Sequence, residues 1–262
     1  MRKRRPPRAW IGTPGAPDPA ELLGPAGLTA EVLRGDDEQE GAQWARTSNG
    51  RDWHFYWSIL TPERQARILA VVGARLKSLT VVLDCLLDPH NAAAILRTSE
   101  GLGIAKAHLI SHQEQDALAH RRVTQDAHKW LEVELHGTGA AAARALRARG
   151  FEVWAGHLDD NAVVYTGLPA GRPLALLFGN EHQGPSRETL AACTGSFRIP
   201  MAGFTQSFNV SVAAGIALAQ AARARREFLQ AAGDLPAEER VLLQERFTLL
   251  AAKLARRVKP EG

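Results

Sequence analysis

The stretch TVVLDCLLDPHNAAAILRTSEGLGIAKAHLI, residues 80–110, holds the pattern that decides the fold. Two short β-rich apolar runs, TVVLDCLL and AHLI, flank an alanine-rich segment of helical composition. Near-continuous apolar runs are typical of strands buried on both faces, and strands that alternate with helices are typical of parallel pairing. The stretch therefore predicts one strand–helix–strand unit of a parallel sheet.

The same alternation continues to about residue 226. Further strand-like runs are WLEVELH, FEVWAGHL and PLALLF, and further helical segments are GTGAAAARALRARG and SVAAGIALAQAARARREF. The segment TPERQARILAVVGARL predicts a helix with Thr61 as its N-cap and Pro62 at its first position. We expect an α/β domain, in which helices cover both faces of a parallel sheet.

The two ends of the chain differ in composition from this central region. Residues 1–60 begin with the basic MRKRRPPR and are rich in proline and glycine, which predicts a largely disordered extension, with an RNA-binding arm as the alternative. The aromatic DWHFYWSIL near its end is expected to dock on the folded body. Residues 227–262 carry apolar residues at helical spacing from Leu243 to Leu254, which predicts a C-terminal helical extension. The domain lies between these parts, over 61–226.

Overall composition excludes several classes of protein. The formal net charge of +4 permits a nucleic-acid partner without requiring one. The two cysteines follow no metal or redox spacing, and the nine histidines form no pair with ligand spacing on a helix. No apolar run reaches the ~18 residues that span a membrane. These features predict a cytoplasmic protein with neither a membrane segment nor a bound metal.

The segment DPHNAAAILRTSEGLG places polar residues around a predicted helix. Asn91 is expected to cap its start, and Gly101 or Gly103 to end it. Arg97 lies mid-helix among small apolar residues. It is expected either to pair with Glu100 or to grip a phosphate or carboxylate.

A second polar segment, LLFGNEHQGPS, follows a predicted strand. The strand runs into Gly179, and Asn180 and Glu181 come directly after it. Ligands of open α/β sheets bind beyond the carboxyl ends of strands, so this loop is well placed for binding. An ordinary polar turn is the alternative.

The third segment, IPMAGFTQSFNVSVAAGIAL, is mostly apolar but contains four polar side chains. These are Gln206, Ser207, Asn209 and Ser211. Burying such groups without partners costs about 1–3 kcal/mol each, so partners are expected in the protein or in a bound molecule.

A competing signal lies at Gly137-Thr138-Gly139, which opens a helical segment twenty residues before Asp159. The pattern is similar to a dinucleotide fingerprint and would indicate an NAD(P)-dependent oxidoreductase. It carries little information in an alanine-rich chain, and earlier strand–helix units precede it. A Rossmann fingerprint would normally stand on the first strand of its unit.

Together the three polar segments, in this order and spacing, resemble the motifs of the SpoU/TrmH family. These are RNA ribose 2′-O-methyltransferases of the trefoil-knot (SPOUT) class, and the resemblance covers about residues 61–226. TPERQARI, HKWLEVELH and LPAEER are similar to the tRNA guanosine branch of the family. The resemblance implies a deep C-terminal knot, a homodimer, S-adenosylmethionine as methyl donor and a tRNA substrate, with no DNA or membrane partner.

The resemblance also implies a set of site residues. Arg97 would be the catalytic residue, surrounded by Asn91, Glu181, Ser207 and Asn209. The cofactor would be held mainly by backbone groups, around Gly156, Leu177, Gly179, Ile199, Met201 and Phe208. Gly156 stands where the tRNA branch commonly has Thr, so a side-chain contact is absent there. Basic segments at residues 1–8, 120–122, 223–226 and 253–259 would contact RNA phosphates.

The identity of the proton acceptor stays open at this point. A guanidinium is effectively always protonated, so Arg97 is a poor base unless a substrate phosphate shares the task. Arg97 could instead stabilise the 2′-alkoxide, with Glu181 as an alternative acceptor. An rRNA 2′-O-methyltransferase and a catalytically silent RNA-binding relative are the competing functions.

Overall fold

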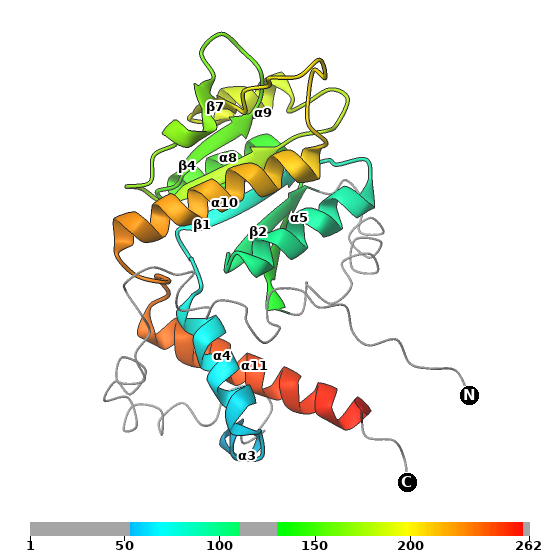
Figure 1. Ribbon diagram of the computed structural model, residues 1–262. Helices are drawn as coiled ribbons and strands as arrows, with labels where there is room; N and C mark the ends of the chain where they lie inside the picture. Colours follow the sequence, from blue (N-terminus) through cyan, green and yellow to red (C-terminus); the bar gives the residue numbers. More distant parts are fainter. Residues whose placement is uncertain (1–52, 111–129, 259–262) are drawn as a thin grey trace, which may run out of the picture. The chain divides into compact units, whose positions relative to one another are not determined.

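The computed structural model describes residues 53–110 and 130–258 (Figure 1). Most of the predicted N-terminal extension and the basic segment at 120–122 therefore lie outside the described residues. Within the described part, no helix is long and apolar enough to cross a membrane.

Seven strands form one sheet in the order β3–β2–β1–β6–β4–β7–β5, and every neighbouring pair is parallel. The strands are β1 Leu79–Asp84, β2 Lys106–Ile110, β3 Glu132–His136, β4 Glu152–Gly156, β5 Val163–Val164, β6 Leu174–Phe178 and β7 Gly195–Arg198. Every residue of the central strands β1 and β6 is buried. The predicted parallel α/β sheet is confirmed.

Helices cover both faces of this sheet (Figure 1). The helices are α3 Trp53–Ser58, α4 Pro62–Gly73, α5 Pro89–Gly101, α8 Gly139–Ala148, α9 Arg187–Ala192, α10 Val210–Leu229 and α11 Ala237–Val258, with a 3₁₀ turn η1 Tyr165–Gly167. Helices α5 and α10 pack together in one apolar core, and α8 and α9 contribute to the other. Alternate side chains of each central strand point into the two cores.

A third apolar cluster joins the first helices to the last one. Ile68 and Val72 of α4 pack with Phe247 and Ala251 of α11, and α3 also contacts α11. The predicted start of α4 is confirmed, because Thr61 caps it by accepting a hydrogen bond from the Arg64 N–H, and Pro62 opens the helix. Leu243, Phe247 and Leu250, which belong to the apolar spacing predicted for α11, lie in this cluster.

Three arginines at the amino ends of the strands are engaged by the protein itself. Arg75 is 1% exposed and donates to the backbone carbonyls of Ile104 and Trp130 and to the Glu100 carboxylate. The other two belong to the segment 223–226, which we expected to contact RNA phosphates. Arg225 donates to the Ser78 hydroxyl, and Arg226 to carbonyls that include Leu102. That expectation is wrong for both, because their guanidinium groups satisfy buried acceptors.

Candidate active site

The loop after β1 leads into α5, and its cap differs from the one predicted. Asp88, not Asn91, is the N-cap: its carboxylate accepts a hydrogen bond from the His90 N–H at 2.8 Å, and Pro89 takes the first helical position. An Asp-Pro pair suits a helix start because the aspartate accepts orphan N–H groups and proline needs no partner there. The side chain of Asn91 is consequently available for another contact.

Asn91 uses this freedom to join two neighbouring loops. Its amide donates to Oε1 of Glu181, in the loop after β6, at 2.9 Å. Its Oδ1 accepts from the amide of Asn209, before α10, at 3.1 Å. Three predicted site residues from three segments therefore form one hydrogen-bonded chain at the carboxyl ends of the strands.

The Glu181 carboxylate is held mainly by the loop after β1. The Leu87 N–H donates to Oε2 at 2.9 Å and the Asp88 N–H to Oε1 at 3.4 Å, besides the Asn91 amide. Burial alone would raise the pKa of Glu181, but hydrogen bonds from Asn91 and Leu87 outweigh it and hold the pKa below its usual value. A carboxylate stabilised in this way is a weak proton acceptor, so its geometry favours positioning over base catalysis.

Asn180, which belongs to this loop but not to the predicted site residues, shapes the same loop. Its Oδ1 accepts from the N–H groups of His182 and Gln183, and its amide donates to the Cys85 carbonyl. A Cβ on Gly179 would lie 2.3 Å from the Pro185 nitrogen, so only glycine fits at this turn. An asparagine between a strand-ending glycine and an acid was the available signal, because asparagine commonly caps its own turn.

Arg97 lies on α5 in a different environment from the three joined residues. Its side chain is exposed, and among the described residues it has no hydrogen-bond or ion-pair partner. The predicted pairing with Glu100 is wrong, because Glu100 binds the buried Arg75 at 2.9 Å. An exposed guanidinium without a partner among the described residues can bind an anion through two parallel N–H donors.

The loop that carries Ser207 corrects the expectation of buried polar groups. Gln206, Ser207 and Asn209 are all exposed, and Asn209 caps α10 by accepting from the Ser211 N–H at 2.9 Å. Ser207 makes no hydrogen bond to the other predicted catalytic residues in the described chain. Phe204 and Phe208 of this loop are exposed as well. The polar groups therefore face outward, where a ligand or partner can reach them.

The residues predicted to hold the cofactor meet at the carboxyl ends of adjacent strands. Strands β6, β4 and β7 are neighbours, so Gly156 at the end of β4 lies at the same edge of the sheet as Gly179 and Ile199, which directly follow β6 and β7. A Cβ on Gly156 would lie 3.4 Å from both Phe178 and Phe197, whose rings pack edge to face. The remaining predicted members follow in the same segments: Leu177 in β6, Met201 after β7 and Phe208 before α10.

This edge fits the group that the family resemblance implies. Its side chains are apolar, which suits the flat body of an adenine, and the strand ends offer backbone groups for polar atoms. Because Gly156 has no side chain, the space next to the Phe178 and Phe197 rings, where a Cβ would lie 3.4 Å from each, stays open. The predicted set is thus compatible with S-adenosylmethionine held by backbone contacts.

The competing dinucleotide signal has a structural explanation. Thr138 caps α8, and a Cβ on Gly139 would lie 2.2 Å from Oδ2 of Asp84. A buried carboxylate thus occupies the helix start where a pyrophosphate would have to lie. Asp159, the expected ribose ligand, is bound to the Ser196 hydroxyl and the Asn161 N–H. This arrangement speaks against an NAD(P) site at Gly137-Thr138-Gly139.

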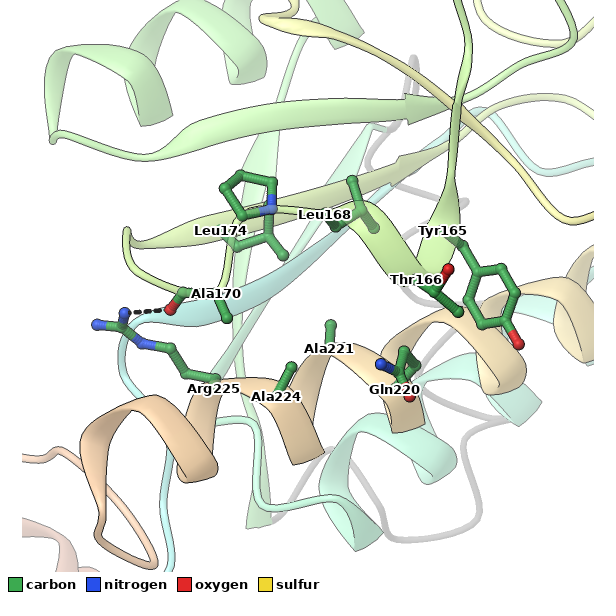
Figure 2. Close-up of a pocket in the computed structure, with 10 residues that line it drawn as sticks. Tyr165, Thr166, Leu168, Ala170, Leu174, Gln220, Ala221, Ala224 and Arg225 are labelled. Carbon is green, nitrogen blue, oxygen red and sulfur yellow. Dashed lines mark hydrogen bonds between the residues drawn. The ribbon is translucent and has the colours of Figure 1, made fainter.

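Two cavities lie away from the motif residues. The first, between η1 and α10, has a volume of about 10 Å³, room for roughly one water molecule (Figure 2). In it Arg225 donates to the Ala170 carbonyl. The second is a groove of about 540 Å³ between the amino ends of β1–β3 and helix α11. Neither contains a predicted site residue.

Comparison with known proteins agrees with the geometry. The chain is 35% identical over 205 residues to a tRNA (guanosine(18)-2′-O)-methyltransferase of Escherichia coli, covering 76% of this chain and 88% of that one. It is 38% identical over 165 residues to the protein of the same name from Thermus thermophilus, covering 63% and 84% of the two chains.

Solved structures give the same assignment. A TrmH/SpoU tRNA modifying enzyme of Aquifex aeolicus superposes with a TM-score of 0.64 at 30% identity, covering 72% of this chain and 96% of that one. An AdoMet-bound rRNA methyltransferase of Sinorhizobium meliloti gives 0.50 at 31% identity, with 55% and 56% covered. The SpoU rRNA Methylase family model matches residues 78–219, more than half of the chain. The sheet, the joined motif residues and these likenesses establish that the chain belongs to the SpoU rRNA methylase family.

Proposed function

We propose that this protein transfers a methyl group from S-adenosylmethionine to a ribose 2′-hydroxyl of RNA, at a guanosine in the D-loop of tRNA. The observation that carries the proposal is the chain of hydrogen bonds through Asn209, Asn91 and Glu181, with Arg97 on the same helix as Asn91 and without a partner among the described residues. Curated relatives from E. coli and T. thermophilus are named for this reaction on tRNA guanosine 18.

The cofactor would be held at the edge formed by β6, β4 and β7. Backbone groups around Leu177–Gly179 and Ile199–Met201, with the Phe208 backbone, would bind it, and Gly156 would leave room beside it. When bound, S-adenosylmethionine supplies an activated methyl group. The neighbour from S. meliloti is described as AdoMet bound.

In this proposal Arg97 positions the RNA and stabilises the developing charge on the ribose oxygen. Its guanidinium stays protonated, so it acts as a donor to the 2′-oxygen or to an adjacent phosphate. Glu181 and Asn209 hold the Asn91 side chain in the first turn of α5, and Arg97 lies further along the same helix. The proton leaves to a substrate phosphate or water, since the Glu181 carboxylate is already engaged. Ser207 would contact the substrate from the exposed loop.

The architecture beyond the sheet is part of the proposal. The strand order inserts β6 between β1 and β4, and β7 between β4 and β5, which supports a trefoil knot near the C-terminal end of the domain. Exposed apolar side chains at the start of α10 and in the loop before it, Phe204 and Val212, support a homodimer. The proposed domain organisation is an N-terminal extension over residues 1–60, the methyltransferase domain over 61–226 and a C-terminal helical extension over 227–262. A tRNA substrate would place the protein in the cytoplasm, without a need for DNA or a metal in this reaction.

The runner-up is an rRNA 2′-O-methyltransferase with the same site. The S. meliloti neighbour carries that name, and the site geometry is common to both substrates. Two basic segments that would help to select the RNA, residues 1–8 and 120–122, lie outside the described residues.

The decisive experiment is methyl transfer from labelled S-adenosylmethionine to unmodified tRNA and rRNA transcripts, followed by alkaline hydrolysis. Alkali does not cleave next to a 2′-O-methyl ribose, so the label appears in a resistant dinucleotide. We expect label from tRNA, lost when the D-loop guanosine is replaced by adenosine and when Arg97 is replaced by alanine. Label from rRNA alone would establish the runner-up, and no transfer to either RNA would contradict the proposal.

A further inference from the structure

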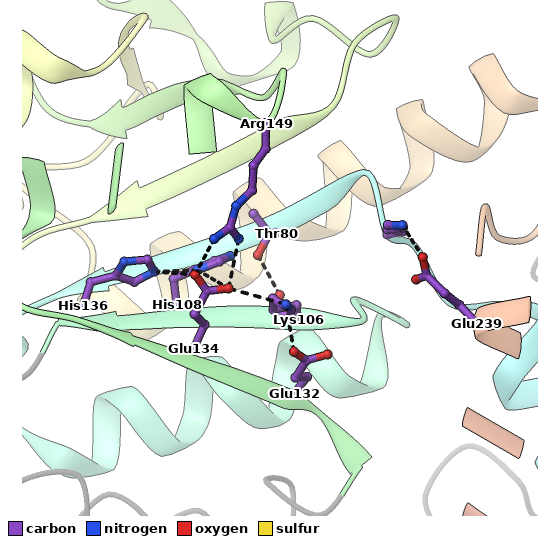
Figure 3. A network of polar contacts seen from close by, with 9 residues as sticks. Thr80, Lys106, His108, Glu132, Glu134, His136, Arg149 and Glu239 are labelled. Carbon is purple, nitrogen blue, oxygen red and sulfur yellow. Dashed lines mark hydrogen bonds and ion pairs between the residues drawn. The ribbon is translucent and has the colours of Figure 1, made fainter. Parts of the chain in front are cut away.

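A compact cluster of three potential metal ligands lies far along the sheet from the motif residues. His108 of β2 faces Glu134 of β3 in register, and His136 lies two residues further along β3 on the same face. Nδ1 of His108 is 2.9 Å from Nε2 of His136 and 4.0 Å from a Glu134 oxygen, and His136 is 3.5 Å from the other Glu134 oxygen (Figure 3).

These separations resemble those of donors around a single Zn²⁺ ion. Ligands about 2.0–2.1 Å from zinc in a tetrahedron lie about 3.3 Å from one another. The observed distances of 2.9, 3.5 and 4.0 Å bracket that value, and because the two carboxylate distances involve different Glu134 oxygens, the carboxylate must rotate to bring one oxygen toward both rings. Two imidazoles and one carboxylate are also a common donor set for zinc, with one position left for water.

The burial of this cluster favours ligation over simple solvation. His108 is 1% exposed, and its Nδ1 has His136 Nε2 as its neighbour at 2.9 Å. The cluster nevertheless has an approach from solvent. Lys106, His108 and Arg149 line the groove of about 540 Å³ beside α11.

Two cations compete for the same carboxylate. Arg149 donates to both Glu134 oxygens, at 2.7 and 2.9 Å, and Lys106 lies 3.4 Å from Oε2. Lys106 also pairs with Glu132 at 2.7 Å, so two cations and two carboxylates cancel in formal charge. The Arg149 side chain is 48% exposed, so it has room to turn into solvent. Its two hydrogen bonds to Glu134 would be given up when the carboxylate binds a metal, so Arg149 competes with the ion.

We propose that His108, Glu134 and His136 bind one Zn²⁺ ion, which fastens the edge strand β3 to β2. The ligand atoms are Nδ1 of His108, Nε2 of His136 and one oxygen of Glu134. The ion takes the place of the proton between the two imidazoles, and the ring that donated this proton carries it on its other nitrogen instead, so that both rings bind as neutral imidazoles. The site is separate from the proposed methyl-transfer site, and its role is to stabilise the sheet.

The test is equilibrium dialysis of the full chain against Zn²⁺, with metal analysis of the dialysed protein and thermal unfolding with and without Zn²⁺. We expect one ion per chain at 10 µM free Zn²⁺ and a raised Tm. Co²⁺ used as a probe should give the intense visible absorption of a tetrahedral site. A value below half an ion per chain would overturn the proposal and leave a hydrogen-bonded histidine pair.

Three variants make the test specific. His136→Gln should weaken Zn²⁺ binding at least tenfold, whereas Glu132→Gln removes a neighbouring charge without removing a ligand and should change it little. Arg149→Gln should tighten binding about two- to fivefold, because a competing cation is removed. Unchanged binding in His136→Gln, or weaker binding in Arg149→Gln, would overturn the assignment. If His136→Gln fails to fold, the affinity of Arg149→Gln for Zn²⁺ decides the question.

Discussion

The amino ends of the sheet and the exposed surface of α5 use arginine in opposite ways. At the amino ends of the strands, the side chains of Arg75 and Arg225 are buried and donate to protein acceptors. On the surface of α5, Arg97 is exposed and has no partner among the described residues. A buried guanidinium must be satisfied by the fold, whereas an exposed one is available to a ligand. We therefore expect substitutions of the buried arginines to change stability and substitution of Arg97 to change activity.

The largest expected effect on stability is at Arg75. Arg75→Ala would strand the Ile104 and Trp130 carbonyls and the Glu100 carboxylate, and should lower the free energy of unfolding by about 3–5 kcal/mol. Urea unfolding followed by circular dichroism measures this. A loss below about 1 kcal/mol would show that the amino-end arginines do not hold the helices together.

On the surface of α5, Arg97→Ala should reduce methyl transfer about 10²–10³-fold, because the donor to the developing oxyanion is lost. The free energy of unfolding should change by less than about 0.5 kcal/mol, since the side chain is exposed. Arg172→Ala is the matched control, because Arg172 is also exposed and pairs with Glu152, outside the predicted site and RNA-binding segments. Equal losses of activity in both variants would erase the contrast between buried and exposed arginines.

Gly139→Ala tests a buried contact near the carboxyl end. The new Cβ would collide with the Asp84 carboxylate, which should cost about 1–3 kcal/mol of stability. Activity per folded molecule should remain, because Gly139 is not part of the motif cluster. Thermal unfolding and initial rates measure the two effects. Binding of NAD(H) to the wild-type protein would instead revive the dinucleotide interpretation.

The smallest expected effect concerns Glu181. Glu181→Gln keeps one oxygen acceptor for the loop after β1, so methyl transfer should fall only about tenfold. Hydrogen bonds from Asn91 and Leu87 lower the pKa of Glu181 from its usual value, so the carboxylate is ionised at neutral pH. Its hydrogen bonds to the loop after β1 weaken only when the pH falls through that lowered pKa. The rate profiles of wild type and variant between about pH 6 and 8 should therefore be parallel. Disappearance of an ionisation in the variant would identify Glu181 as the proton acceptor.

Local patterns in the sequence were sufficient for the elements and for much of the site. Apolar runs and helical spacing predicted the strands and helices, and Thr61-Pro62 predicted the start of α4. The three polar segments predicted which loops carry the site. These features depend on neighbours in the chain, so single-chain periodicity and capping chemistry are enough to find them.

Other outcomes depend on residues that are distant in sequence. Asp88 rather than Asn91 caps α5, and Asn91 instead reaches Glu181, ninety residues away. The proposed zinc ligands depend on the fold in the same way, because Glu134 and His136 share a strand face at a spacing of two and meet His108 only across the sheet.

The roles of the arginines show the same division most clearly. The sequence by itself determined the positions of the arginines along the chain, and the family resemblance implied phosphate contacts for the basic segment 223–226. Only the tertiary structure decided that Arg225 and Arg226 donate to hydroxyl and carbonyl acceptors distant in the sequence, while Arg97 has no partner among the described residues. The reason is physical: a guanidinium is committed by the acceptors buried around it, and those acceptors are brought together only by the packing of the whole sheet.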